Sequence, residues 1–158
     1  MELTYENMLD HLTKYFDAIW ELKGPQDKPK MTEFFAPNFV IRYGRPMKVW
    51  NREQWVDSLC DPAADKEKYL ITHNKHPYYW LIDVRKKAAA GFIKEQIKHP
   101  KTGQLLREFS LTPHFGFTVI DGSIKFSWEL IAWVDVPYLV ESLGTENPLK
   151  AWYDRLPK

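Results

Sequence analysis

The sequence predicts a single α+β domain, residues 1–158, in which the helices are segregated from a curved, mainly antiparallel sheet. Three observations lead to this fold class. One long amphipathic segment near the start predicts a helix, and alternating segments in the second half predict strands joined by hairpins. Between the last two strands, Asp121-Gly122 is the kind of pair that tight antiparallel turns prefer. A chain of 158 residues also has the length of one domain with one core.

Three helices are expected before the main run of strands. In residues 4–22 apolar residues recur every three or four positions, and a following Gly-Pro pair ends the pattern. The stripe consists of Met8, Leu9, Leu12, Tyr15, Phe16, Ile19 and Trp20. Residues 31–35 predict a short second helix. Asn51 is placed to cap a third helix over residues 52–59.

The strands are expected to pair as hairpins. The predicted strands are residues 39–43, 47–50, 69–74, 78–84, 88–98, 108–120 and 123–134. A short closing helix at residues 136–143 and a tail at residues 147–158 that docks on the domain complete the prediction. A bent sheet of this size, wrapped on a long helix, leaves room for a cavity between them.

The composition limits the classes of partner. Positive and negative charges nearly cancel, with a net charge of +1, so neither a nucleic-acid footprint nor a polybasic membrane patch is expected. The acidic first residues lack the apolar run of a signal peptide, and no stretch approaches the ~20 apolar residues of a membrane helix. The single cysteine, Cys60, rules out an internal disulfide and favours the cytoplasm. The seven tryptophans fill a core, line a pocket or build a subunit interface.

Three segments together resemble a known fold family. They are Phe34-Phe-Ala-Pro-Asn-Phe-Val-Ile41, Val49-Trp-Asn-Arg-Glu-Gln-Trp55 and Val119-Ile-Asp-Gly-Ser-Ile-Lys125. In this order, with the predicted elements, they resemble the NTF2-like superfamily, in particular its SnoaL-like branch of small-molecule enzymes. The resemblance covers nearly the whole chain. It implies a cone-shaped fold with a mostly apolar pocket between the first helix and the sheet.

A narrower resemblance concerns the end of the sheet. The segment Gly122-Ser-Ile-Lys-Phe-Ser-Trp-Glu129, followed by Val140-Glu-Ser-Leu-Gly144, resembles the phenazine-biosynthesis condensing proteins, a dimeric branch of the same superfamily. Those proteins have a catalytic glutamate in the last strand, and Glu129 falls at that position. They also have a histidine acid on the third helix, where this chain has Asp57 and Ser58. The resemblance therefore implies a role for Glu129 and leaves phenazine chemistry unsupported.

Strand alternation leaves two interpretations of Glu129 open. Counting from Ile124, alternation groups Phe126 and Trp128 on one face, and Lys125 and Glu129 on the other. A solvated Glu129 beside Lys125 is the simplest account. The same face becomes apolar towards the strand end, so Glu129 can instead enter an apolar pocket, where its pKa would rise.

Few other side chains are placed for acid–base chemistry. The candidates besides Glu129 are Asp57, His73, His76, His114, Tyr43 and Tyr79. Alternation groups His114 with polar residues, and a surface role remains an alternative for it. His11, on the first helix, is interpreted as solvent-facing. No histidine pair has convincing metal spacing, and no phosphate-binding loop is present, so neither a metal nor a cofactor is expected.

Three functions compete. The first is a cofactor-independent lyase, isomerase or cyclase that acts on a small, largely apolar or aromatic metabolite, with Glu129 as the base and His73, His114 or Asp57 as further catalytic candidates. The second is a non-catalytic binding protein with the same pocket, and the third is a protein-interaction module. Expected ligand-binding residues are Tyr15, Ile19, Tyr43, Trp55, Tyr79, Phe92, Phe117 and Trp133.

A homodimer built on the outer face of the sheet is also expected. Large residues occur on both faces of the last strands, and five of them exceed what one cavity holds. The five are Phe115, Phe117, Phe126, Trp128 and Trp133.

Overall fold

The structure is a computed structural model that describes residues 1–43, 47–61, 70–73, 79–98 and 101–134. Within these ranges, the side chains of residues 70–73, 94–98, 106–109 and 133–134 are not described. The helices are α1 (Tyr5–Trp20), a 3-10 turn (Pro25–Asp27), α2 (Lys28–Thr32) and α3 (Arg52–Leu59). The strands are β1 (Phe35–Tyr43), β2 (Lys48–Asn51), β3 (Leu70–His73), β4 (Trp80–Asp83), β5 (Ala88–Gly91), β6 (Ile93–Lys98), β7 (Leu105–Ile120) and β8 (Ser123–Val134).

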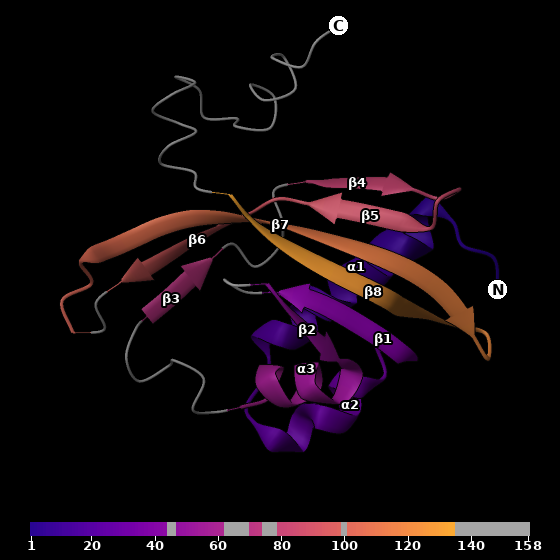
Figure 1. The fold of residues 1–158 in the computed structure, drawn as a ribbon, viewed down its shortest axis with the longest axis horizontal. Coiled ribbons are helices and arrows are strands. Elements are labelled where there is room, and N and C mark those ends of the chain that lie inside the picture. Colours follow the sequence, from indigo (N-terminus) through magenta and orange to yellow (C-terminus); the bar gives the residue numbers. More distant parts are fainter. Residues whose placement is uncertain (44–46, 62–69, 74–78, 99–100, 135–158) are drawn as a thin grey trace, which may run out of the picture.

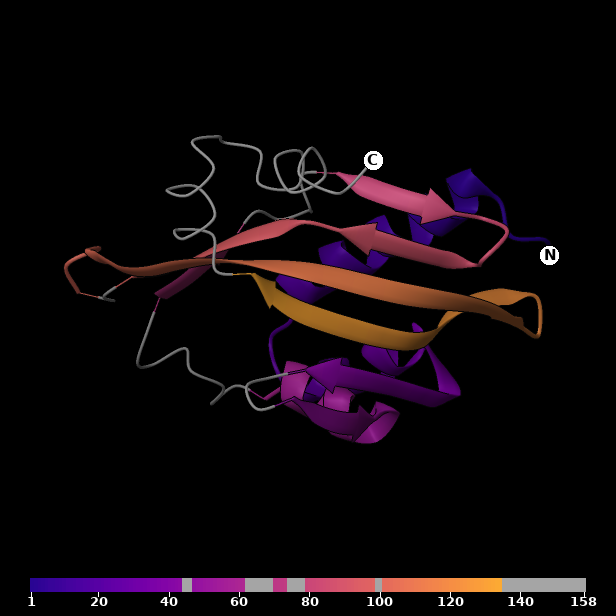
Figure 2. The same ribbon diagram turned by 45° about the horizontal axis from the view of Figure 1, so that its top comes forward.

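The strands form one curved sheet, in the order β2-β1-β8-β7-β5-β4. Strand β6 also pairs with β7, and β3 pairs with β6. All pairings are antiparallel except that between β1 and β8, which is parallel. Helix α1 lies across one face of the sheet, while α2 and α3 lie beside β1 and β2 (Figure 1; Figure 2). The predicted α+β class and the helix-wrapped, mainly antiparallel sheet are confirmed.

Helix α1 follows from its cap and its stripe. The side chain of Thr4 accepts a hydrogen bond from the backbone N–H of Asn7, and the Asn7 side chain accepts one from the backbone N–H of Thr4. This reciprocal capping box satisfies two N–H groups that the first turn would leave unpaired. Met8, Leu12 and Tyr15 are buried against the sheet, as the spacing of the stripe predicts.

The start of the first long strand differs from the prediction. Helix α2 ends at Thr32, three residues before the predicted end, and β1 begins at Phe35 and passes through Pro37. A proline has no N–H to donate to a ladder. Pro37 is tolerated here because β2 pairs with β1 only from Val40 onward, and the pairing with β8 shifts register between Phe35 and Val40.

The predicted strand at residues 88–98 is two strands. Strands β5 and β6 flank Phe92 and pair with successive stretches of β7. Before the break, Gly91 lies under the ring of Trp80, and a Cβ at this glycine would be 2.6 Å from a ring carbon. The close approach needs a residue without a side chain, and it brings the edge strand β4 onto the core.

A β-bulge in β8 overturns the alternation expected from the sequence. Gly116 pairs with Trp128, but the next residue of β7, Phe117, pairs with Phe126. Ser127 is therefore left over as the bulged residue. As a result, Phe126 and Glu129 are on the same, inner face, whereas Trp128 is exposed on the outer face.

The packing of the inner face shows that one argument for a dimer, the number of large residues on the last strands, was partly wrong. Phe115, Phe117 and Phe126 are all buried under α1, where their rings pack against each other and against Tyr15. Of the large side chains that were expected to be too many for one face, Trp128 is the one described on the outer face. The predicted helix at 136–143 and tail at 147–158, together with His76 and His99, lie outside the described residues.

Candidate functional site

Glu129 lies inside the core, at the middle of β8. In the sheet it sits between Ile41 of β1 and Phe115 of β7, both fully buried on the same face. The residue itself is only 4 % exposed. The solvated interpretation is therefore wrong, because the bulge at Ser127 rotates the second half of the strand relative to the first.

One oxygen of the Glu129 carboxyl group, Oε2, is buried without a hydrogen-bond partner in the described residues. Burial raises the pKa of Glu129 well above the usual 4.5, because removal from water disfavours the charged form. A carboxyl group in such a site is poised to change its protonation state at a pH where an exposed glutamate stays ionised.

Two further polar groups reach the same region from two helices. Tyr15 of α1 is almost fully buried, and its pKa is raised first by burial and second by the charge of Glu129. The indole N–H of Trp55, on α3, interacts with the phenol oxygen and lowers the Tyr15 pKa. The Nε1–H of Trp55 is buried beside the phenol oxygen of Tyr15. A carboxyl, a phenol and an indole N–H thus belong to the same part of the interior.

Aromatic and aliphatic side chains surround this cluster. The Trp55 ring packs against Tyr43 at 5.6 Å and against Trp50 at 6.5 Å between ring centroids. Beyond Glu129 the inner face continues with three buried aliphatic residues, Ile131, Leu111 and Ile93. Apolar neighbours around a few polar atoms are the combination that small-molecule sites use.

Two of the predicted catalytic residues do not meet Glu129. His114 belongs to the outer face of the sheet, since its neighbour Phe115 occupies the inner face opposite Glu129. It lines a shallow outer groove of about 320 Å³ with Trp128, and burial lowers its pKa. Asp57 is exposed on α3 and forms an ion pair with Lys28 at 2.7 Å. Neither side chain is positioned to exchange a proton with Glu129.

His73 is placed only through its backbone. It pairs with Glu95 in the two-stranded extension formed by β3 and β6, and its side chain lies outside the described residues. The backbone of Trp133 pairs with Leu111, and its side chain is likewise not described. The roles expected for these two residues stay predictions.

The predicted ligand-binding residues lie in different parts of the structure. Tyr15, Tyr43 and Trp55 lie in or beside the Glu129 cluster. Phe117 instead packs against His11 and Phe126 at the other end of α1, so it is a core residue. The remaining three are Ile19, half-buried against the core, and Tyr79 and Phe92, whose rings stack at 6.3 Å.

His11 is a half-buried group that the sequence interpretation missed. It was expected to face solvent, but its imidazole packs against Phe34 at 5.4 Å and Phe126 at 4.6 Å. Burial lowers the pKa of His11 to about 4, and its Nε2 atom is buried without a hydrogen-bond partner in the described regions. The signal was present: His11 follows Met8 by three positions and precedes Tyr15 by four, so it belongs to the apolar stripe.

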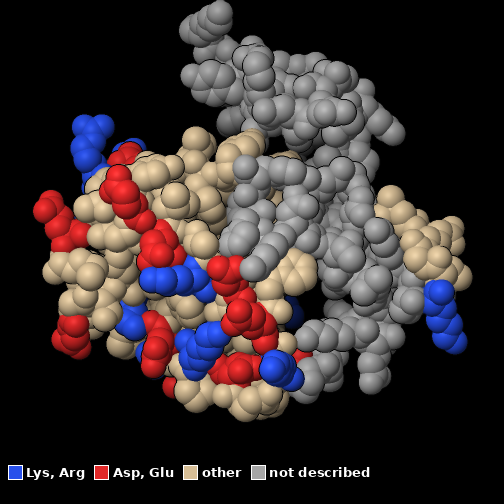
Figure 3. Space-filling view, turned by 180° about the vertical axis from the view of Figure 1, so that it is seen from behind, with Lys and Arg blue, Asp and Glu red and all other residues tan. Residues whose placement is uncertain are grey.

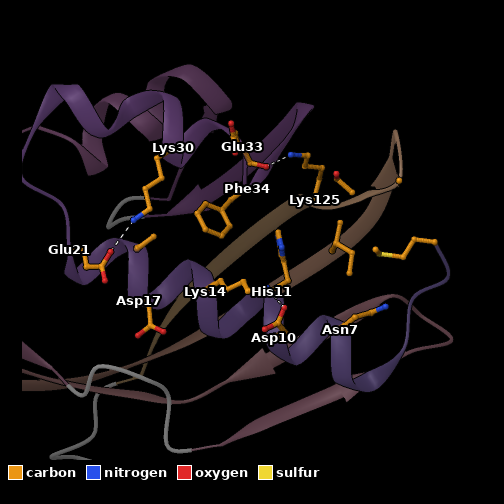
Figure 4. Close-up of a pocket in the computed structure, with 15 residues that line it drawn as sticks. Asn7, Asp10, His11, Lys14, Asp17, Glu21, Lys30, Glu33, Phe34 and Lys125 are labelled. Atoms are coloured by element: carbon orange, nitrogen blue, oxygen red, sulfur yellow. Dashed lines mark hydrogen bonds and ion pairs between the residues drawn. The ribbon is translucent and has the colours of Figure 1, made fainter.

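A groove of about 710 Å³ opens beside His11, between α1, α2 and the start of β8 (Figure 4). Its rim carries paired charges: Lys30 with Glu21 at 2.9 Å and Lys14 with Asp10 at 2.6 Å, while Lys125 donates to the backbone carbonyl of Glu33. Acidic and basic side chains are interspersed over this side of the molecule (Figure 3). The groove, the outer groove and a third hollow beside α3 are not lined by Glu129.

The described residues contain no cluster of three or more His, Cys, Asp or Glu side chains that could hold a metal ion. No helix in the described ranges is both long and apolar enough to cross a membrane.

The helix-wrapped, curved sheet defines the class of fold: the chain has the NTF2-like fold. No family model matches the sequence, and no curated protein matches it. Solved structures do match. An NTF2-like protein from Cytophaga hutchinsonii has a TM-score of 0.53 at 12% identity, with 84% of this chain and 100% of that chain covered.

Two further solved structures are similar to most of this chain. Aln2 from a Streptomyces species has a TM-score of 0.62 at 11% identity, with 87% of this chain and 98% of that chain covered. PrhC from Penicillium brasilianum has a TM-score of 0.56 at 13% identity, with 94% of this chain and 95% of that chain covered. At such identities the similarity establishes the fold and leaves the chemistry to the side chains.

Proposed function

We propose that the protein is a cofactor-independent acid–base enzyme, a lyase, isomerase or cyclase, that acts on a small, largely apolar or aromatic metabolite. Glu129 is the general base. The observation that carries the proposal is the buried Glu129 carboxyl group, which has an unpartnered oxygen in an apolar interior. Positioned acid–base groups of this kind accelerate reactions by roughly 10²–10⁴.

The energetics of burial favour a functional role for Glu129. An ionisable group that is removed from water without a partner destabilises the folded state. A structural glutamate would be expected to recover this free energy through hydrogen bonds or an ion pair. For Glu129 neither is found among the described residues, and strongly shifted carboxyl groups concentrate at functional sites.

Two other functions compete. A non-catalytic small-molecule-binding protein would use the same aromatic walls, and a protein-interaction module would use the fold as a scaffold. A protein-interaction module would give the buried Glu129 carboxyl group no role, and a binding protein would use it only as a polar contact for the ligand. A general base, in contrast, needs the raised pKa that burial gives this group. The buried carboxyl group therefore favours the enzyme.

The test uses hydrogen exchange, because it needs no knowledge of the product. The protein is incubated in D2O with a panel of small aromatic and polyketide-like compounds that have acidic C–H bonds, and exchange is followed by NMR. Glu129→Gln keeps the shape of the side chain but removes the base, so exchange should slow by about 10² or more. Glu53→Gln, at an exposed glutamate of α3, is the matched control.

Thermal stability distinguishes a variant that has lost only the base from a variant that has lost its fold. Because burial disfavours the charged carboxylate, the Glu129→Gln variant should melt at the same temperature as the parent protein, or at a higher one, at neutral pH. A variant that folds and still catalyses exchange at the parental rate would overturn the assignment. Binding of panel compounds without exchange in either form would support the binding protein instead.

The outer face of the sheet supports a homodimer as part of the proposal. Val40, Val49, Leu81 and Trp128 are exposed large apolar residues on this face, which α1 does not cover. A second copy of the chain, placed face to face, would remove them from water. We also place the protein in the cytoplasm, because its one cysteine, Cys60, is a buried free thiol.

A further inference from the structure

The groove between α1, α2 and the start of β8 lies apart from the Glu129 cluster (Figure 4). Its volume is about 710 Å³, and neither Glu129 nor Tyr15 nor Trp55 is among the residues that line it. Sites for small molecules commonly have volumes of roughly 300–1,000 Å³. The groove therefore has the size of a ligand site that is separate from the candidate active site.

Contacts between three segments hold the inner end of this groove in place. The backbone carbonyl of Phe34 accepts a hydrogen bond from the N–H of Phe126 at 2.8 Å, and the neighbouring carbonyl of Glu33 accepts one from the Lys125 ammonium. The imidazole of His11, on α1, packs against the rings of both Phe34 and Phe126. Helix α1, the connection from α2 to β1, and β8 are thus joined here without a ligand.

Two aromatic side chains form the apolar part of the lining. His11 and Phe34 are half-buried, and their rings lie 5.4 Å apart with an angle of 55° between their planes. The pKa of His11 is lowered to about 4, chiefly by burial, so its imidazole is neutral at pH 7. Ala18 and Ile124 add aliphatic surface to the same lining. Aromatic rings pack favourably against other rings, either offset or edge to face, so this surface suits an aromatic group.

The three lysines that line the groove differ in their partners. Lys14 forms an ion pair with Asp10 at 2.6 Å, and Lys30 forms one with Glu21 at 2.9 Å. Lys125 donates to a backbone carbonyl instead, and no ion pair joins it to a carboxylate in the described part of the chain. An ammonium group has three hydrogen-bond donors. Lys125 therefore keeps its positive charge and two donors for an anion.

This positive charge lies at the edge of the aromatic surface. Lys125 directly precedes Phe126, whose ring is 4.6 Å from that of His11. Burial is the largest cause of the low His11 pKa, and Lys125 is the charged group that affects this pKa most. The Glu33 side chain, which also lines the groove, is exposed, so water and salt screen its repulsion of an anion.

We propose that the groove is a second ligand site, which binds a small aromatic carboxylate. The ligand carboxylate accepts hydrogen bonds from the Lys125 ammonium, and the ligand ring packs against Phe34 and His11. The aromatic surface selects the ring, and the one lining lysine without a carboxylate partner among the described residues selects the negative charge. The proposal does not depend on the function proposed for Glu129.

The test is a titration of the parent protein with benzoate at pH 7, followed by NMR. The ring-proton signals of His11 should shift until the groove is saturated, while the indole N–H signal of Trp55 stays in place. Lys125→Gln removes the charge that the carboxylate binds and should weaken the affinity about fivefold. Lys86→Gln, at an exposed lysine in the turn between β4 and β5, is the matched control and should keep the parental affinity.

A second variant and two further probes test the chemistry of the ligand. Glu33→Gln removes a carboxylate from the lining, so benzoate should bind about twofold more tightly, opposite to the effect of Lys125→Gln. Benzylamine has a similar ring with a positive charge, and cyclohexanecarboxylate has the carboxylate without an aromatic ring. Both should bind more weakly than benzoate, because each lacks one of the two features that the groove recognises.

Several results would overturn the proposal. They are the absence of a saturable shift at His11, parental affinity in a folded Lys125→Gln variant, and tighter binding of benzylamine or cyclohexanecarboxylate than of benzoate. A shift at Trp55 without one at His11 would place benzoate near Glu129 and would also remove the groove site. That last result would leave the proposed function standing, since Glu129→Gln tests it separately.

Discussion

The pKa values of two residues, the half-buried His11 and the buried Glu129, shift in opposite directions. Both lie between α1 and the inner face of the sheet, and both have a nitrogen or oxygen without a hydrogen-bond partner among the described residues. Burial lowers the pKa of the histidine and raises that of the carboxylic acid, because in each case the neutral form is favoured. The folded state is therefore penalised by acid at His11 and by base at Glu129.

His11 predicts a loss of stability in mild acid. Its folded pKa of about 4 lies below the ordinary value of 6.5, so the unfolded chain binds more protons between these pH values. The free energy of unfolding should fall as the pH drops from 6.5 to 4, by about 3 kcal/mol from this residue. Urea titrations of the parent protein and of His11→Phe at pH 7 and pH 4.5 measure the difference.

The phenylalanine variant should lose less stability than the parent over that range, because the ring remains apolar at every pH. An NMR titration of the His11 ring protons in the folded parent gives the pKa itself. A midpoint near 6.5 would show that the imidazole is hydrated, contrary to the packing against Phe34 and Phe126.

At the scale of single residues, the sequence indicated which residues are candidates better than it indicated whether their side chains are buried or exposed. Glu129 was recognised as the leading candidate, but alternation could not decide which face it occupies. The decision depends on Ser127, a bulged residue with no distinguishing side chain. His11 was missed for a different reason: a histidine on a helix was interpreted by its polarity, although its spacing from Met8 and Tyr15 placed it in the buried stripe.

At the scale of elements, the bulge in β8 is coupled to a glycine in β7. The indole of Trp128 lies over Gly116 on the outer face, and a Cβ at Gly116 would be 2.0 Å from the indole nitrogen. Immediately after this pair, the register between the strands shifts. Trp128 and Gly116 thus hold the strands in the register that turns Glu129 inward.

Gly116→Ala should destabilise the protein. The new Cβ overlaps the indole of Trp128, so either the ring or the strand must move, at a cost of about 1–3 kcal/mol. Chemical denaturation measures the change. Adding Trp128→Ala removes the overlapping ring and should recover much of the stability that Gly116→Ala loses, relative to Trp128→Ala alone.

If the losses of stability in Gly116→Ala and Trp128→Ala simply add in the double variant, this coupling is contradicted. In that case the two residues would act independently, since residues in contact deviate from additivity and distant ones do not. The space over Gly116 would then not be what limits the position of Trp128.

At the same scale, local patterns predicted most elements. Helix α3 has the predicted bounds, because Asn51 caps it and β2 ends there. Phe92, however, divides one predicted strand into β5 and β6, since each pairs with a different part of β7. Such a break is imposed by the curvature of the sheet, which the alternation of short segments does not encode.

At the scale of the whole molecule, the two faces of the sheet are unlike. The inner face is filled by the rings of Tyr15, Phe115 and Phe126 under α1. On the outer face, small residues such as Ala88 and Ala90 alternate with exposed large apolar ones in neighbouring strands. One face therefore forms the core and the candidate site, and the other is available for a partner.

The global pairing of strands was harder to predict than the strands themselves. Hairpins such as β7–β8 follow from turn residues. The parallel pairing of β1 with β8, however, joins segments that are more than 80 residues apart in the sequence. No local signal specifies it. The candidate site depends on this pairing, because it brings Ile41 beside Glu129 and positions α3, with Trp55, over the inner face.

The last prediction concerns the outer face. Val49 and Leu81 are 65% and 66% exposed, at opposite edges of the sheet, with Trp128 between them. If a second copy covers this face, the parent protein should sediment as a dimer at micromolar concentration. Leu81→Lys would bury an unpaired charge in that interface and should shift the protein to the monomer. Tyr5→Lys, at an exposed residue of α1 away from the face, should remain dimeric. A monomeric parent, or a Leu81→Lys variant that is still dimeric, would move the interface elsewhere.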